Sequence, residues 1–96
     1  MMPRPRCCRR VSITPRVLYY KPRGIPLIDL DEVVIAADEL EALRLSDLLG
    51  LEQTKAAEQM GISQPTLNRI LTAARKKIAD ALVNGKAIRI EREVRC

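Results

Sequence analysis

One short run, Ala-Ala-Glu-Gln-Met-Gly-Ile-Ser at residues 56–63, leaves this chain few ways to fold. Ala57 and Met60 fall on one face of a helix predicted over residues 51–60. Gly61 follows at once, which suits a helix end with positive φ. Ser63 is a good N-cap for a second helix, because its hydroxyl can accept from a free N–H of the next turn. The run therefore predicts two helices joined by a very tight turn.

The second helix is predicted over residues 63–84. Pro65 falls in its first turn, where a missing N–H costs little, and Gly85 stands at the left-handed cap position. The residues expected to face the core recur at helical spacing. They are Leu67, Ile70, Leu71, Ala74, Ile78, Ala81 and Leu82.

This pair of helices predicts a helix-turn-helix, in which the second helix lies in the DNA major groove. A plain structural hairpin is the alternative. The outward face of the second helix favours DNA, because it carries short or forked hydrogen-bonding groups and no acid until Asp80. Arg69 is expected to contact a guanine edge, or else a phosphate, and Gln64 and Asn68 beside it suit adenine. The DNA-contacting residues predicted in this helix are Ser63, Gln64, Pro65, Thr66, Asn68, Arg69, Thr72, Arg75 and Lys76.

Charge is segregated along the chain, whose formal net charge is +5. Residues 1–24 carry basic side chains and no acid, residues 25–60 are mainly acidic, and the balance turns basic again from Arg69. A polyanion would meet the two basic ends. Residues 1–16 are predicted to form a basic arm, which is either a solvated tail or a segment lying along phosphates or in a minor groove. Its DNA-contacting residues are predicted to be Arg4, Arg6, Arg9 and Arg10.

The length of 96 residues allows one small domain, predicted over residues 17–96. Three short β-rich runs flank the helices, at residues 17–20, 33–35 and 86–94, and the first can equally be an extended segment. The last run can pair with residues 33–35 of its own chain or of a second chain. The predicted fold class is mainly α, with a three-helix helix-turn-helix core, short flanking β-strands and a basic N-terminal arm.

A further helix is predicted from Asp38 to Leu49. Asp38 and Glu41 resemble a capping box. Glu39 and Glu41 could suggest acid–base catalysis, but acids at a helix start are better explained by their interaction with the positive end of the helix dipole. The apolar stripe expected on this helix is Leu40, Leu43, Leu45, Leu48 and Leu49. Anchoring apolar contacts ahead of it are expected from Leu27, Ile28 and Leu30.

Enzyme activity has little support, since the chain has no histidine and no phosphate loop. No cofactor is expected. Cys7, Cys8 and Cys96 are odd in number, which argues against a disulfide framework, and a three-thiolate metal site is the less favoured alternative. No apolar run is long enough to span a bilayer and no signal-peptide pattern is present. We therefore expect a cytoplasmic protein.

Several segments together carry a family resemblance. They are PRPRCCRR, PRGIP, DELEALRLxD, AAEQMGISxxT and ARKKIADALVNGKAIxI. Between about Arg4 and Ile90 the chain resembles a family of small prokaryotic proteins, largely uncharacterised and predicted to bind DNA. The helix-turn-helix is similar to region 4 of bacterial sigma factors, which implies a winged or extended helix-turn-helix fold and a role in transcription. Glu52 departs from the Ser or Thr expected to cap the first helix of the motif, so that start is weaker.

Sequence-specific binding of double-stranded DNA by a transcription regulator is the leading hypothesis. The alternatives are an interaction module that contacts RNA polymerase through the acidic middle, and a cysteine-based redox- or metal-responsive regulator. A homodimer is expected, because two-fold proteins read paired half-sites. The strand near Ile88 and Ile90 is the candidate interface, since a free edge invites pairing.

Overall fold

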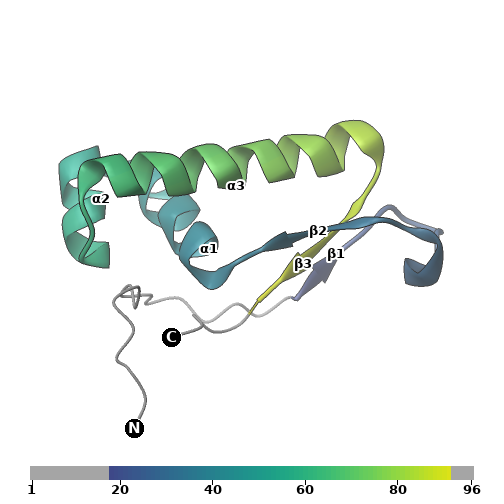
Figure 1. Cartoon of the computed structure of the whole chain (residues 1–96). Helices are drawn as coiled ribbons and strands as arrows, with labels where there is room; N and C mark the ends of the chain where they lie inside the picture. Colours follow the sequence, from purple (N-terminus) through teal and green to yellow (C-terminus); the bar gives the residue numbers. More distant parts are fainter. Residues whose placement is uncertain (1–17, 92–96) are drawn as a thin grey trace, which may run out of the picture.

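The computed structural model describes residues 18–91. Figure 1 shows the long helix α3 with α1 and α2 beside its N-terminal half and a small sheet beneath its C-terminal half. The elements are β1 (Tyr19–Tyr20), the 3-10 turn η1 (Leu27–Asp29), β2 (Glu32–Ile35), α1 (Ala37–Leu43), the π-helical η2 (Arg44–Leu48), α2 (Gln53–Met60), α3 (Gln64–Asn84) and β3 (Ala87–Ile90). The described chain is thus mainly helical with short strands, as predicted. The predicted basic arm at residues 1–16 lies outside it.

The three strands form one sheet in the order β1-β3-β2. β3 runs antiparallel to β1, pairing Ile88 with Tyr20, and parallel to β2, pairing Ile88 with Val33. β3 therefore pairs with the predicted second strand of its own chain. The expectation that β3 offers a free edge for dimerisation is wrong, because a strand occupies each side of it.

The helix α1 begins differently from the prediction. It starts at Ala37, and the side chain of Glu39 reaches back so that its Oε1 accepts from the Ala36 N–H at 2.9 Å. The predicted capping box of Asp38 and Glu41 is wrong, because Asp38 already lies inside the helix. Glu41 instead is 2% exposed and accepts two hydrogen bonds from Arg44, at 2.8 and 3.0 Å.

The apolar stripe predicted along this helix holds only in part. Leu45 is buried and Leu40 and Leu43 are half-buried, whereas Leu48 and Leu49 are 78% and 53% exposed. A π-helical turn closes i→i+5 hydrogen bonds, so η2 rotates its last residues out of the 3.6-residue register that the stripe assumed.

The anchoring contacts predicted ahead of β2 are largely wrong. Ile28 is 90% exposed and Leu27 is 37% exposed, because both lie in η1, at the end of the sheet away from α1 and α2 (Figure 1). Leu30 alone of the three is half-buried.

The link between α2 and α3 follows the prediction closely. Gly61 has φ of 70°, and the N–H of Ile62 donates to the carbonyl of Ala57 at 3.0 Å. The hydroxyl of Ser63 caps α3 by accepting from the N–H of Thr66 at 3.3 Å. At the other end of α2, the side chain of Glu52 makes no capping hydrogen bond, as its departure from Ser or Thr predicted.

The main core lies where α1, η2, α2 and the first half of α3 meet. Its buried members are Ala42, Leu45, Ala56, Ala57, Met60, Leu67, Ile70 and Leu71. Full burial of each large member contributes about 1.5–3 kcal/mol to stability. The second half of α3 buries Ala74 and Ala81. Leu82, predicted to face the core, is 75% exposed, because it projects beyond the side of α3 that the narrow sheet covers.

Candidate nucleic-acid interface

The first turns of α3 present a row of polar side chains away from the core. Packing of Leu67, Ile70 and Leu71 against α1, η2 and α2 fixes the rotation of the helix about its axis. The periodicity of 3.6 residues then turns the positions between them outward. The exposed members of this row are Gln64, Pro65, Asn68, Arg69 and Thr72, as predicted. We call them the outward row.

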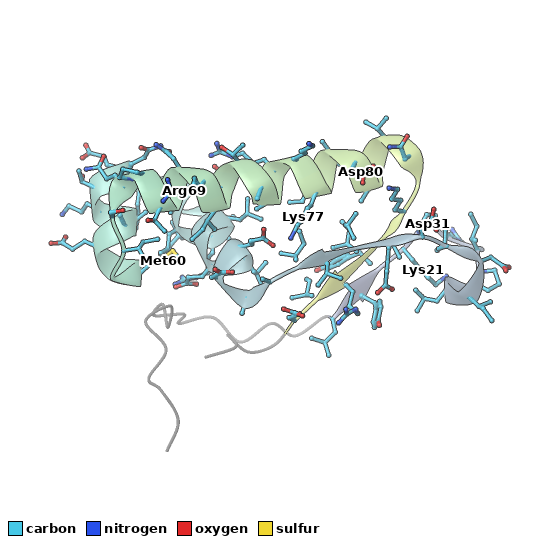
Figure 2. All side chains as sticks on the ribbon, viewed as in Figure 1. Lys21, Asp31, Met60, Arg69, Lys77 and Asp80 are labelled. Carbon is cyan, nitrogen blue, oxygen red and sulfur yellow. The ribbon has the colours of Figure 1, made fainter. Side chains whose placement is uncertain are left out.

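The hydroxyls of Ser63 and Thr66 form hydrogen bonds within the start of α3. The Ser63 Oγ donates to the Thr66 Oγ1 at 2.9 Å, while Thr66 also accepts from Nη2 of Arg69 at 3.4 Å. The guanidinium of Arg69 therefore lies back along its own helix and keeps most of its donors open to solvent. Figure 2 places Arg69 on the half of α3 that lies near α2.

Gln53, in the first turn of α2, forms a hydrogen bond with Asn68 of the outward row. Its Nε2 donates to Oδ1 of Asn68 at 2.7 Å, which ties α2 to α3 across the turn. The side chain of Asn68 is exposed, and its amide nitrogen makes no hydrogen bond within residues 18–91, so both of its N–H donors stay available and Oδ1 keeps a second lone pair. Sequence reasoning missed Gln53. The sequence carries one signal for this role, which is that an amide side chain stands in the first turn of the helix before α3 and can reach the polar face of α3.

The two cations that follow the outward row have different environments. Arg75 donates to the carboxylate of Asp47 through Nη2 at 2.6 Å and Nε at 3.1 Å. These hydrogen bonds hold the pKa of Asp47 below its ordinary value and raise the pKa of Arg75. Lys76, by contrast, is exposed and forms no ion pair within residues 18–91. The structure therefore leaves Lys76 available to an anion and holds Arg75 against η2.

A cleft of about 410 Å³ borders the outward row on the side of α1. Asp38 and Glu39 line it opposite Arg69 and Lys77. Lys77 donates to Glu39 at 2.8 Å and to the carbonyl of Val34 at 2.9 Å, so its charge is matched inside the protein. The side of the row toward α1 is thus acidic or neutral, and an anion is better accepted on the side toward α2.

The remaining predicted contacts fall on residues 1–17 and 92–96, outside the described part of the chain. These contacts are Arg4, Arg6, Arg9 and Arg10. The three cysteines of the less favoured metal site, Cys7, Cys8 and Cys96, also lie there. Within residues 18–91 no cluster of three or more His, Cys, Asp or Glu residues is arranged to hold a metal ion. In that same range none of the helices combines the length and apolar character needed to cross a membrane.

These features define a small, mainly helical protein with a three-stranded sheet and one polar, acid-free helix face. The chain belongs to the family described as Protein of unknown function DUF134, which it matches over residues 1–93. No solved structure matches the chain significantly.

Several curated relatives are named UPF0251 protein. One from Dehalococcoides mccartyi is 63% identical over 90 residues, covering 94% of this chain and 77% of the relative. Another from Moorella thermoacetica is 61% identical over 90 residues, and there the chain covers 60% of the relative's length. A third, from Thermoanaerobacter pseudethanolicus, is 58% identical over 90 residues, with 94% and 76% of the two chains covered. The expected membership of a small, uncharacterised prokaryotic family is confirmed.

Proposed function

We propose that the protein binds double-stranded DNA sequence-specifically and regulates transcription, with α2 and α3 acting as a helix-turn-helix. The observation that carries the proposal is the outward row on the first turns of α3. Its hydrogen-bonding side chains are exposed together, and residues 64–79 contain no acid. A helix that served only for packing would have no need of this combination.

Recognition of bases is assigned to Arg69 and Asn68. An arginine guanidinium can fork onto the O6 and N7 of guanine, and the open donors of Arg69 suit that contact. Asn68 is held by Gln53 at 2.7 Å, so its amide is oriented before DNA arrives. A side chain ordered in advance loses less entropy on binding, which sharpens the discrimination between bases.

Phosphate contacts are assigned to Lys76 and to the first turn of α2. The backbone N–H groups there have no intrahelical partner, and Glu52 does not cap them with its side chain. Free N–H groups at a helix start favour a phosphate oxygen. Because the acids Asp38 and Glu39 lie beside the outward row on the side of α1, the DNA backbone would pass on the side of α2.

The interaction-module alternative relied on an acidic surface in the middle of the chain. Much of that charge is matched within the protein, since Glu41 pairs with Arg44, Glu39 with Lys77 and Asp47 with Arg75. The internal pairing of these acids therefore argues against a contact with RNA polymerase through this surface. A cytoplasmic location and a homodimer remain predictions.

Selection of bound sequences from a random DNA pool tests the proposal, followed by binding measurements on the selected site and its single-base variants. Arg69→Ala should cost on the order of 1–3 kcal/mol and relax one base position, while Lys76→Ala should weaken every sequence alike. Equal losses on all variants for Arg69→Ala would remove it from the base-reading residues. Failure to enrich any sequence at low salt would overturn the proposal itself.

A further inference from the structure

One side of the second half of α3 is apolar and uncovered. Ile78 lines a hollow of about 460 Å³ together with Leu40, Leu43 and Leu48. Leu82 lies one helical turn further along and lines a second hollow of about 370 Å³ with Tyr20, Pro22 and Ile88. Residues four apart share one side of a helix, so the two hollows follow each other along α3. We call this surface the apolar face, defined by Leu43, Leu48, Ile78, Leu82, Tyr20 and Ile88.

The exposure on this face is contiguous and comes from separate elements. Leu48 in η2 is 78% exposed and Leu82 in α3 is 75% exposed. Apolar residues scattered singly over a surface are ordinary, but a continuous apolar surface marks an interaction site. The helix behind it also needs support, because a helix draws most of its stability from packing, and Ala81 is the last buried residue of α3.

Most charges at the rim of the apolar face are matched within the chain. Asp47 pairs with Arg75 at 2.6 Å, and Asp80 pairs with Lys86 at 2.9 Å. The exception is Lys21, whose Nζ donates to the carbonyl of Ile25 at 2.8 Å and pairs with no acid in residues 18–91. A rim in which one lysine is left unmatched offers little net charge to a phosphate backbone or a strongly acidic partner, and it repels a copy of itself only weakly. A two-fold interface needs this self-complementarity, because each patch meets the same patch.

We infer that the apolar face binds a second copy of this chain, with the two α3 helices antiparallel and crossing between Ile78 and Leu82. In that arrangement Arg75 of one copy lies beside the C-terminal end of α3 of the other, near Gly85. The last carbonyls of a helix carry partial negative charge, which favours a guanidinium there. The side chain of Arg75 is 54% exposed beyond its pair with Asp47, so it can make this contact.

The same arrangement suits paired half-sites, a point that rests on the proposed function. The crossing lies about 18 Å along α3 from the middle of the outward row. Two copies therefore hold their outward rows about 36 Å apart, which is close to the 34–36 Å of one DNA turn. The outward row lies about a quarter turn around α3 from the apolar face, so both rows can face one side of the dimer.

The mass of the full chain in solution, measured without DNA by light scattering at micromolar concentration, tests the inference. The wild type should have twice the chain mass. Leu82→Glu and Leu48→Glu should each raise the dimer dissociation constant tenfold or more, with unchanged helical circular dichroism. Both residues are exposed, so neither substitution removes core packing.

Val83→Glu is the matched control. Val83 is 80% exposed and adjacent in sequence, but it lies about 100° around the helix from Leu82, outside the apolar face. It should leave the dimer intact. Three results would each overturn the inference. The wild type could be monomeric, Leu82→Glu and Leu48→Glu could leave the dimer intact, or Val83→Glu could dissociate it as strongly as they do. A wild-type monomer that dimerises when residues 1–17 are removed would assign the face to the chain's own N-terminal segment instead. Because no DNA is present, none of these outcomes depends on the proposed function.

Discussion

Charged side chains in the described part of the chain divide into those held by a partner and those open to solvent. Arg44, Arg75 and Arg89 each bind a carboxylate of their own chain at 2.6–2.9 Å. Arg69 and Lys76 form no ion pair within residues 18–91. The positive charge that α3 offers to an anion is therefore concentrated at these two residues, which project from the same side of the helix.

The contrast between neighbouring cations leads to the first prediction. Lys76→Ala should weaken DNA binding by a similar factor on all sequences and reduce the slope of log affinity against log salt by about 1. Arg75→Ala should leave the affinity of the binding site nearly unchanged when measured per protein dimer, because Asp47 holds that guanidinium. Binding measured at two salt concentrations separates the two. A larger loss for Arg75→Ala would show that the ion pair opens on DNA.

The pair of Asp47 and Arg75 also gives stability a pH dependence. Hydrogen bonds from Arg75 lower the pKa of Asp47, so the folded state favours the ionised carboxylate. The resulting stability is fully present at neutral pH and is lost as pH falls through the acid range in which Asp47 is protonated. Both side chains are largely exposed, so Asp47→Asn should cost only about 0.5 kcal/mol at pH 7. Urea unfolding of wild type and variant should converge once the pH lies well below the ordinary range of a carboxyl group, because the lowered pKa of Asp47 must first be passed. A difference that stays constant from pH 7 to that acid limit would contradict this.

Some helix ends in this chain are determined by residues close in sequence, and others depend on residues that are distant in sequence. The ends around the tight turn follow from Gly61, Ser63 and Pro65, whose backbone preferences act within a few residues. The start of α1 does not, because Glu39 is positioned by Ala36 and by Lys77 from a distant part of the chain. The π-helical turn of η2 likewise left no local signal, so the exposure of Leu48 was not predictable from the stripe.

The same distinction separates the predicted and unpredicted parts of the candidate site. Periodicity alone identified the outward row, because burial of Leu67, Ile70 and Leu71 forces it. The bridge from Gln53 to Asn68 and the capture of Arg75 by Asp47 join residues far apart in sequence. A sequence pattern specifies which residues are exposed, but it does not specify which distant partners restrain them.

The end of α3 supplies a prediction for a single backbone position. Gly85 has φ of 68°, and a Cβ added there would meet nothing within 4 Å. Gly85→Ala should therefore destabilise the fold by about 1 kcal/mol through backbone strain alone. Gly85→Asn should cost less, because asparagine tolerates the left-handed region. Equal losses for both variants in urea unfolding would mean that something other than φ limits this position.

In the molecule as a whole, α3 joins two packing centres. Its first half completes the core formed with α1, η2 and α2, and its second half, which buries Ala74 and Ala81, lies over the sheet (Figure 1). The proposed DNA surface belongs to the first half and the proposed dimer contact to the second. One rigid helix thus fixes the distance between the two proposed functions.

The basic arm adds a prediction for the full chain. Arg4, Arg6, Arg9 and Arg10 have no acids near them in sequence, so phosphates are their natural partners. Deletion of residues 1–10 should weaken binding similarly on all sequences and flatten its salt dependence. Binding to the selected site and to scrambled DNA provides the measurement. A change in the preferred sequence would instead show that the arm contacts bases.

The place of β3 in the sheet has a consequence for how the chain is made. β3 is the last element described, yet it fills the middle position between β1 and β2. During synthesis the two outer strands emerge first and have no strand to pair with until Ala87–Ile90 leaves the ribosome. The helices can pack beforehand, since their contacts are complete by the end of α3. A chain interrupted before Ala87 would retain its helical part and expose two unpaired strands, the condition in which strands of different molecules join and aggregate.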